Sequence, residues 1–369
     1  MSGDSATTAS PLGDRLAARI ARLGPMTLAD YMAEVLTHPE QGYYMRRDPF
    51  GARGDFITAP EISQMFGELI GLWCVETWRR MGARAPVLLV ELGPGRGTLM
   101  ADALRAARLD PDFIAALELH LVEVSPALRR RQRDALADTV SPTWHESLAG
   151  VPEGPMLLIA NEFFDALPVR QFEKRGRGWC ERLVGLAEDG HSLAFALAPP
   201  GPQGTALLPP ELAEAPDGAI AEVSPASITI AHEIGRRVAA EGGAALVIDY
   251  GHARPRTGAT LQAVRAHGFH PVLADPGSAD LTAHVDFAAL ARAAEQAGAR
   301  AQGPVTQGRF LEALGIGARA AALAEAGTTE QASGIEADQR RLTHPDEMGT
   351  LFKVLALGHP GLGPLAGFE

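Results

Sequence analysis

The sequence predicts an α/β protein built on a doubly wound, mostly parallel sheet. Apolar runs at 87–90, 119–122, 156–160 and 244–248 have the length of buried strands, and each is followed closely by polar or turn-forming residues. Segments with helical patterns lie between these runs. Strands that alternate with helices favour parallel pairing, because each strand then needs a crossover to return to the sheet.

The first strand passes directly into a glycine loop. The loop contains Gly93, Gly95 and Gly97, with Glu91 two residues before the first glycine. Glycine adopts backbone conformations closed to other residues and lets a ligand lie against the main chain. A dinucleotide-binding loop has the pattern GxGxxG, and its last glycine is replaced here by Thr98. The alternating ExGxGxG pattern instead resembles the S-adenosylmethionine (SAM) loop of class I methyltransferases.

A second acid, Glu123, ends the next strand and is followed by Ser125 and an apparent helix. In a doubly wound sheet the second strand ends beside the first, so Glu123 could accept both hydrogen bonds from a ribose diol. NAD-binding and SAM-binding folds share this arrangement, so Glu123 alone does not choose between the two cofactors. We expect Glu91, the three glycines, Glu123 and Ser125 to contact the cofactor, with Glu91 near its amino end.

The third strand ends in a second group of polar residues. Asn161 and Glu162 follow it directly, and Asp165 comes after two phenylalanines. Ligands and catalytic groups of open parallel sheets gather at the carboxyl ends of strands. Many methyltransferases that act on amino groups have an Asn or Asp at this position, followed by two residues in a tight turn, often prolines, and an aromatic residue. Residues 161–164 are similar but lack the prolines. We expect Asn161 to contact the cofactor and Glu162 and Asp165 to lie beside the reacting group, with a helix cap as the alternative role for Asp165.

The chain divides into a sheet domain and two additions. The N-terminal region is helical, and its loops, which include Asp55, are interpreted as a lid over the site. An alternating and Pro/Gly-rich segment in mid-chain is interpreted as an insertion that grips the substrate. Plain packing of the loops and a purely structural insertion are the alternatives. The expected regions are 1–83 (lid), 84–168 (first part of the cofactor domain), 169–224 (insertion) and 225–369 (second part of the cofactor domain).

Composition narrows the class of protein. At 369 residues the chain can bury a sizeable core, and its formal net charge of −12 argues against general nucleic-acid binding. The arginine-rich run at 128–133 is interpreted as the solvated face of a helix. Cys74 and Cys180 lack metal-site spacing, so we expect no metal and a reducing compartment, by default the cytoplasm. No apolar run approaches the ~20 residues of a membrane span, so no membrane insertion is expected.

Several motifs resemble the MidA family of methyltransferases. They are GDFITAPE at 54–61, ELGPGRG at 91–97, NEFFDALP at 161–168, LTAHVDF at 281–287 and EMG at 347–349. The resemblance covers nearly the whole chain, from about residue 26 to residue 357. The family includes a mitochondrial complex I assembly factor that symmetrically dimethylates an arginine on the 49 kDa-type iron-sulfur subunit.

The resemblance implies the fold, the cofactor and the substrate. It implies a class I methyltransferase sheet whose last strand, at 351–357, runs antiparallel. The implied cofactor is SAM, and the implied substrate is an arginine-bearing complex I subunit. Glu162 and Asp165 would hold the guanidinium and aim one nitrogen at the methyl group, with Asp55 or His284 as a further partner. A packed histidine is the alternative role for His284.

Two other classes of protein fit parts of the sequence. A nicotinamide-dependent oxidoreductase would use the same sheet, but Thr98 and the glycine spacing count against it. An assembly chaperone would hold a partner subunit and use SAM only structurally or not at all. The presence of both ligand acids and all three glycines gives the chaperone hypothesis little support.

Overall fold

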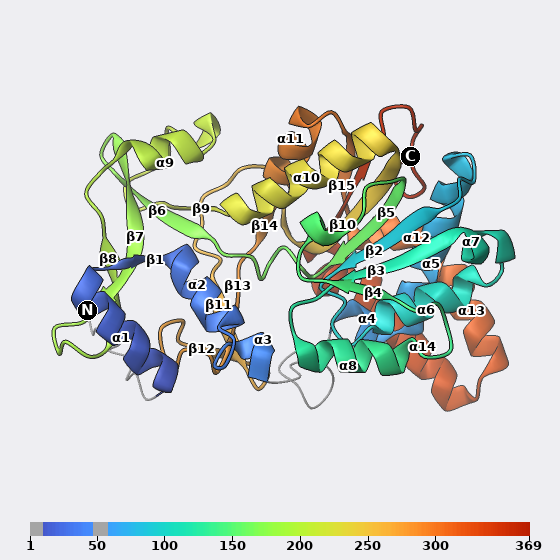
Figure 1. The fold of residues 1–369 in the computed structure, drawn as a ribbon, viewed down its shortest axis with the longest axis horizontal. Helices are drawn as coiled ribbons and strands as arrows, with labels where there is room; N and C mark the ends of the chain where they lie inside the picture. Colours follow the sequence, from blue (N-terminus) through green and yellow to red (C-terminus); the bar gives the residue numbers. More distant parts are fainter. Residues whose placement is uncertain (1–9, 47–57) are drawn as a thin grey trace.

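The computed structural model describes residues 10–46 and 58–369. Its largest element is a central sheet in which β16 runs antiparallel to both of its neighbours, while the other neighbouring pairs along the path are parallel. This arrangement confirms the predicted doubly wound sheet with an antiparallel last strand (Figure 1). From edge to edge the strands are β15 (Arg300–Thr306), β16 (Phe352–Gly358), β10 (Gly243–His252), β5 (Met156–Asn161), β2 (Val87–Leu92), β3 (Leu117–Val122) and β4 (Thr143–His145). A short strand, β14 (Val285–Asp286), pairs with the end of β10.

The central strands are apolar on both faces, because successive side chains of a strand point to opposite sides and helices cover each side. Leu89 and Leu157 belong to one core, and their neighbours Leu88 and Leu158 belong to the other. The first core is covered by α5 (Gln64–Arg80), α6 (Thr98–Ala107), α7 (Pro111–Ala116), α12 (Gln307–Ala313), α13 (Ile316–Ala326) and α14 (Thr329–Thr343). The second core is covered by α10 (Pro225–Glu241) and α11 (Phe287–Gln296).

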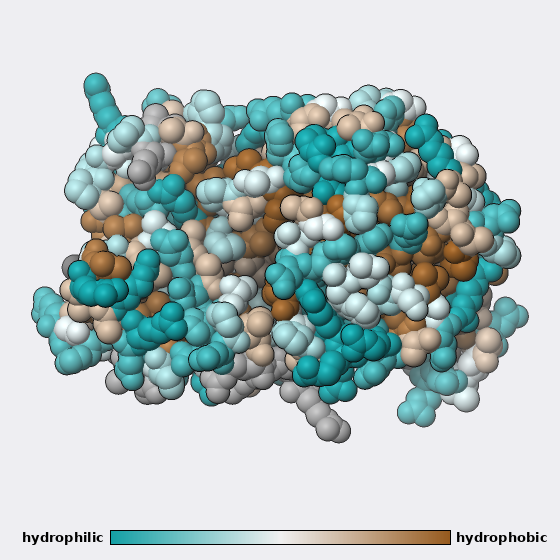
Figure 2. Space-filling view, viewed as in Figure 1, coloured by the Kyte–Doolittle hydropathy of each residue, from teal (hydrophilic) through white to brown (hydrophobic). Residues whose placement is uncertain are grey.

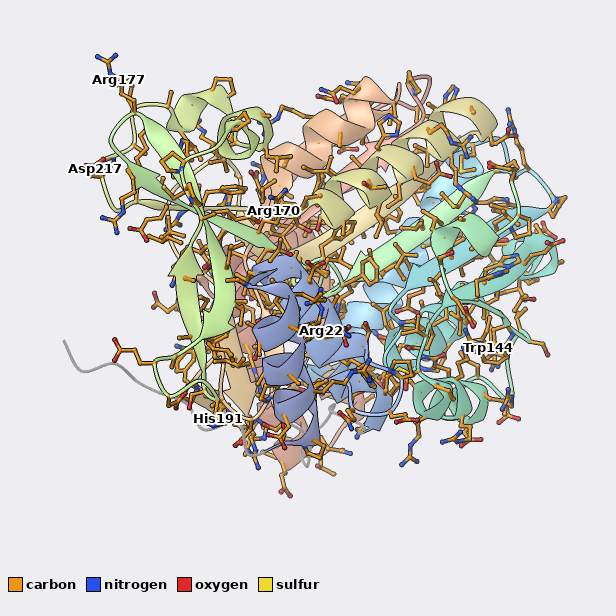
Figure 3. All side chains as sticks on the ribbon, turned by 60° about the vertical axis from the view of Figure 1, so that its left-hand side comes forward. Arg22, Trp144, Arg170, Arg177, His191 and Asp217 are labelled. Atoms are coloured by element: carbon orange, nitrogen blue, oxygen red, sulfur yellow. The ribbon has the colours of Figure 1, made fainter. Side chains whose placement is uncertain are left out.

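A second, antiparallel sheet lies beside the central sheet, on the left of Figure 1. The N-terminal segment joins it directly, because β1 pairs with β7 and Met26 lies opposite Val184. Arg177 and Asp217 stand at its outer end, far from the central sheet (Figure 3). Its strands are β1 (Met26–Thr27), β7 (Gly178–Leu186), β6 (Arg170–Arg175) and β9 (Ile220–Val223), with β8 (Leu193–Leu197) paired to β7.

The N-terminal helices share a core with this sheet and with a small sheet formed later in the chain. Buried side chains of α1 and α2 pack with Val184 of β7 and Leu281 of β13. Segments from three distant parts of the chain therefore form one unit. Its further elements are α1 (Pro11–Leu23), α2 (Leu28–Thr37), α3 (Tyr43–Arg46), β11 (Gln262–Arg265), β12 (Gly268–His270) and β13 (Asp280–Thr282).

Shorter elements connect these parts. They are α4 (Ala59–Ile62), α8 (Pro126–Ala135), α9 (Pro202–Leu207), the 3-10 turns η1 (Leu148–Gly150) and η2 (Pro210–Leu212), and the π-helical turn η3 (Pro345–Gly349). No helix in the described ranges is both long enough and apolar enough to cross a membrane. On the face drawn in Figure 2, hydrophilic side chains dominate, and apolar side chains gather in the hollow between the two halves of the molecule.

Candidate active site

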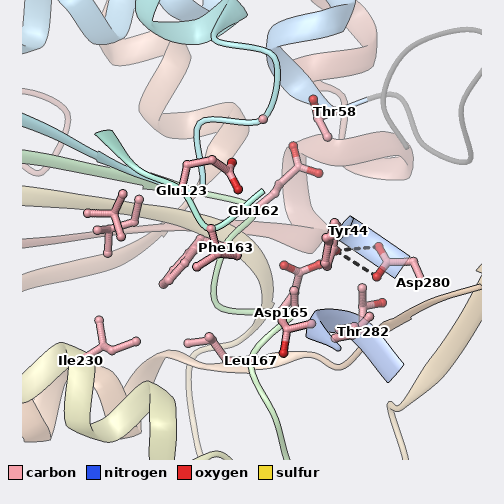
Figure 4. A pocket seen from close by; sticks show the side chains of 18 of the residues that line it. Tyr44, Thr58, Glu123, Glu162, Phe163, Asp165, Leu167, Ile230, Asp280 and Thr282 are labelled. Atoms are coloured by element: carbon pink, nitrogen blue, oxygen red, sulfur yellow. Dashed lines mark hydrogen bonds between the residues drawn. The ribbon is translucent and has the colours of Figure 1, made fainter. Parts of the chain in front are cut away.

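A cavity of about 820 Å³ opens at the carboxyl ends of the central strands. Residues from the loops after β2, β3 and β5 and from the end of β10 form one side of it, and α2, α3 and β13 contribute to the other. Open parallel sheets bind ligands at this edge. The cavity is therefore the place where the residues predicted from the strand ends can meet (Figure 4).

Two of the three predicted glycines line this cavity. Gly93 and Gly95 adopt positive φ angles of 62° and 54°, which non-glycine residues rarely occupy. A Cβ atom on Gly93 would lie 2.9 Å from Cδ2 of Phe163. Gly97 also has a positive φ, of 85°, but it precedes α6 and a Cβ atom there would lie 3.3 Å from the Cα atom of Gln132. The structure thus places Gly97 against α8 and not among the residues that line the cavity.

Glu123 lines the cavity, and two hydrogen-bond donors outside the cavity wall orient its carboxylate. The backbone N–H of Ser125 donates to its Oε1 at 2.8 Å, and Nε2 of Gln132 donates to its Oε2 at 3.1 Å. Burial raises the pKa of Glu123 above its usual value, and these hydrogen bonds oppose the rise. Ser125 itself is fully buried, caps α8 and is not among the residues that line the cavity. It lies in a position to orient Glu123.

Gln132 connects the glycine loop to this acid, a role that the sequence did not reveal. Its Nε2 also donates to the carbonyl oxygen of Gly95 at 2.8 Å, while its Oε1 accepts a hydrogen bond from Nε1 of Trp144 at 2.8 Å. Gln132 is fully buried within the arginine-rich helix. A signal was present, because Leu128, Gln132 and Leu136 recur every four residues and so share one helix face.

Two buried oxygens beside the glycine loop have no partner among the described residues: Oε2 of Glu91 and Oδ1 of Asn161. Both residues line a smaller hollow that includes Gly93 and Gly95 and adjoins the main cavity at Glu162. Burial, with a contribution from Glu123, raises the pKa of Glu91 to about 8. A cationic amine placed here would satisfy both oxygens and favour the ionised form of Glu91.

Glu162 lies where the smaller hollow meets the main cavity. Its φ of 49° is in the left-handed region, which is uncommon for a residue with a side chain and is often found at functional sites. Its Oε1 accepts hydrogen bonds from the backbone N–H of Ala59 at 3.0 Å and from Nδ2 of Asn161 at 3.2 Å. Burial raises the pKa of Glu162 to about 7.

Asp165 is held by the end of the neighbouring strand. Oη of Tyr250 donates to its Oδ2 at 2.7 Å, and its Oδ1 is buried without a partner within the described chain. Burial raises the pKa of Asp165 to about 6. The fully buried Asp249 accepts hydrogen bonds from the backbone N–H groups of Phe164 at 3.0 Å and Asp165 at 3.2 Å. The carboxylate of Asp165 therefore faces Tyr250, and no helix-capping bond to it is found among the described residues.

His284 and Asp55 were predicted as further partners of the guanidinium, and the structure describes only His284. His284 lines the cavity, where its ring packs edge-on against Tyr250 with 5.5 Å between the ring centroids. Its backbone N–H donates to Oγ1 of Thr260 at 2.9 Å, and burial lowers its pKa. Asp55 lies outside the described residues. Within residues 10–46 and 58–369, no group of three or more His, Cys, Asp or Glu could hold a metal ion.

The sheet order, the glycine loop and the acid after the second strand define a class I SAM-dependent methyltransferase. A family model described as an "S-adenosyl-L-methionine-dependent methyltransferase" matches residues 69–305. The chain belongs to this family, the MidA family that the sequence motifs resemble.

Relatives and solved structures agree with this assignment. The mitochondrial protein arginine methyltransferase NDUFAF7 of Mus musculus is 40% identical over 373 residues, which cover 94% of this chain and 84% of that protein. The NDUFAF7 homolog of Drosophila melanogaster is 39% identical over 396 residues, which cover 97% of this chain and 88% of that protein. A crystal structure of a superfamily member from Burkholderia thailandensis bound to S-adenosyl-homocysteine is 30% identical, with a TM-score of 0.84 and coverage of 96% of this chain and 93% of that chain.

The raised pKa of Glu91 predicts a pH-dependent stability of the ligand-free protein. Because its pKa of about 8 in the folded state exceeds the ordinary value of 4.5, the folded state binds more protons than the unfolded state between these values. The free energy of unfolding should therefore fall as pH rises through this window, by at most about 1.4 kcal/mol per pH unit for this group. Denaturant unfolding between pH 5 and pH 8 should show a smaller decrease for Glu91→Gln. An identical pH slope for the variant and the wild type would contradict this account.

Replacing Gln132 should weaken cofactor binding without a change at the cavity wall. In Gln132→Leu, Glu123 loses one hydrogen bond, the Gly95 carbonyl loses its donor and Nε1 of Trp144 loses its acceptor. We expect the Kd for S-adenosylhomocysteine, measured by calorimetry, to rise at least about tenfold, because the loss of even one of these bonds leaves a buried polar group unpaired. Arg130→Ala, an exposed change on the same helix, is the control and should bind like the wild type. Wild-type affinity in Gln132→Leu would show that Glu123 needs no such support.

Proposed function

We propose that this protein transfers methyl groups from SAM to an arginine side chain of a protein substrate. The observation that carries the proposal is a group of carboxylates, Glu162, Asp165 and Asp280, at one end of the cavity (Figure 4). Oδ1 of Asp165 is buried there without a partner in the described part of the chain. A guanidinium stays charged and presents five N–H donors in a planar fork, which suits such a group of acceptors. The relatives named protein arginine methyltransferases support the same substrate class.

The described residues fit SAM at the other end of the cavity. The unpaired oxygens of Glu91 and Asn161 suit the amino group of its methionine part. Glu123 is oriented to accept two hydrogen bonds from a ribose diol. Beyond Glu123, the cavity wall suits a flat base, and its residues there include Val124, Leu128, Ser147 and Leu148.

When bound, SAM supplies a methyl group on a positively charged sulfur, and transfer forms a nitrogen–carbon bond while the carbon–sulfur bond breaks. The protein has to orient the guanidinium and remove a proton from it. Glu162 and Asp165 accept hydrogen bonds from the guanidinium and so fix the direction of the attacking nitrogen. The carboxylate of Glu162 takes the proton that the methylated nitrogen loses. Its raised pKa of about 7 suits a general base that works near neutral pH.

The MidA resemblance supports a finer proposal for the target. We propose symmetric dimethylation of an arginine on the 49 kDa-type iron-sulfur subunit of respiratory complex I, in support of its assembly. We further propose that the reaction takes place in the cytoplasm, although the named relatives are mitochondrial. Fractionation of cells that express the tagged full chain tests this location, and recovery with the membrane fraction would contradict it.

Mass spectrometry of complex I subunits from cells with and without this protein tests the target. We expect one arginine of the iron-sulfur subunit to carry a methyl group on each of two nitrogens, and to be unmodified when the protein is absent. Purified protein should restore the modification with added SAM. Unchanged arginines in both cell types would contradict the target. Co-purification of the subunit with no methyl transfer in either experiment would favour the assembly-chaperone alternative.

A further inference from the structure

Two tyrosine–carboxylate pairs face the substrate end of the cavity. Tyr250 donates a hydrogen bond to Asp165, as described above. Oη of Tyr44 lies 2.9 Å from both carboxylate oxygens of Asp280, and these bonds appear as dashed lines in Figure 4. All four residues line the cavity. Neither Tyr44 nor Asp280 was singled out by the sequence analysis.

The two pairs come from different parts of the molecule. Asp165 follows β5 and Tyr250 lies near the end of β10 in the central sheet, whereas Tyr44 lies on α3 and Asp280 begins β13. Tyr43 and Leu281, the chain neighbours of Tyr44 and Asp280, are buried together in the core of the N-terminal unit. The packing of this unit therefore holds the second pair in place. The complete acidic wall exists only where the unit packs against the central sheet.

Charge also links the two pairs. Burial raises the pKa of Tyr44 well above its usual value, and the negative charges of Asp280 and Asp165 raise it further. Tyr44 therefore stays protonated near neutral pH and lies within electrostatic range of both carboxylates. Its hydroxyl carries a single proton, so it orients the buried carboxylate of Asp280 without neutralising its charge. A cation placed near Tyr44 would be attracted from both sides.

We infer that Asp280 binds the substrate guanidinium together with Asp165, and that Tyr44 is a positioning residue for Asp280. This inference rests on the proposed function and extends it to substrate selection. Asp165 and Asp280 bind the guanidinium nitrogens that do not react, and Glu162 contacts the nitrogen that accepts the methyl group. A planar guanidinium can donate to several carboxylates at once, whereas the compact ammonium of lysine is a point charge. The pair of aspartates thus selects arginine over lysine.

Steady-state kinetics with an arginine-containing peptide test this inference. In Asp280→Asn, the KM for the peptide should rise at least about tenfold, as expected for the loss of a charge-assisted hydrogen bond, and kcat should change less. The Kd for S-adenosylhomocysteine should stay as in the wild type. Tyr44→Phe should raise KM by a smaller factor, and Asp280→Glu should recover part of the affinity. Preference for the arginine peptide over its lysine counterpart should decrease in Asp280→Asn.

Asp275→Asn is the matched control, because Asp275 is a partly exposed aspartate shortly before Asp280 and its ion pair within the described residues, with Arg265, is as long as 3.7 Å. It should leave KM unchanged. If Asp280→Asn does not fold, peptide binding to Tyr44→Phe in the presence of S-adenosylhomocysteine replaces it. A wild-type KM in Asp280→Asn, or an equal loss of peptide and S-adenosylhomocysteine binding, would overturn the inference alone. Failure of the wild type to methylate any arginine would instead overturn the proposed function.

Discussion

The Glu162→Gln variant should bind SAM normally and fail to methylate arginine. The amide keeps the shape of the side chain and one acceptor for the bonds from Ala59 and Asn161. It cannot take a proton from the guanidinium. We expect kcat to fall by roughly 10²–10⁴-fold, the range that general acid–base catalysis contributes. Calorimetry should give a Kd for S-adenosylhomocysteine within about twofold of the wild type, since the loss falls on the chemical step.

The pH profile provides an independent check on the same residue. Because the pKa of Glu162 is raised by burial to about 7, its base form is lost as pH falls through 7. The kcat/KM of the wild type should therefore rise with pH up to about 7 and level off above it. The residual activity of Glu162→Gln should lack this step. Unimpaired methyl transfer by Glu162→Gln, with SAM binding unchanged, would show that Glu162 is not the base.

The Gly95→Val variant should lose cofactor binding. Gly95 has a φ of 54° and lines both the main cavity and the smaller hollow beside Glu91. A branched side chain there is strained in the backbone and occupies space that the methionine part of SAM needs. We expect the Kd for S-adenosylhomocysteine to rise at least about 100-fold, a loss of roughly 2.7 kcal/mol.

Gly190→Val separates strain from blockage of the cavity. Gly190 also has a positive φ, of 70°, but it lies in an exposed turn, and a Cβ atom there would meet nothing within 4 Å. The two variants therefore share the backbone penalty and differ only in where the side chain points. Gly190→Val should bind S-adenosylhomocysteine like the wild type. Normal affinity in Gly95→Val would contradict the placement of the cofactor against this loop.

The central sheet could be predicted because its signals are local. Each inner strand is buried on both faces, so the run at 87–90 and the run at 156–160 are continuously apolar and easily recognised. The partner of the N-terminal segment could not be predicted in this way. Met26 pairs with Val184, and this pairing depends on contacts between distant parts of the chain that no local pattern encodes.

The residues of the site likewise differ in whether a local sequence pattern reveals their role. Glu91, Glu123 and Glu162 could be found because each stands at or directly after the end of an apolar strand. Asp249 and Tyr250 also end a strand, but their roles come from bonds to the loop after β5. The sequence marked them only as polar.

The three glycines of the loop belong to one sequence motif but have different roles. Gly93 and Gly95 line the cavity, while Gly97 gives α6 its first turn and allows close approach of α8. Ser125 is likewise a cap of α8 behind Glu123. The spacing of residues in a loop does not show which of them line the cavity and which of them only orient the residues that do.

A crystal structure of this protein with S-adenosylhomocysteine and an arginine-containing substrate peptide would show directly whether the cofactor and the guanidinium meet in this cavity. We expect the ribose at Glu123, the amino group at Glu91 and Asn161, and the guanidinium between Glu162 and the two aspartates with one nitrogen facing the sulfur. A nucleoside bound away from the glycine loop, or a guanidinium held where none of these carboxylates reaches it, would contradict the account.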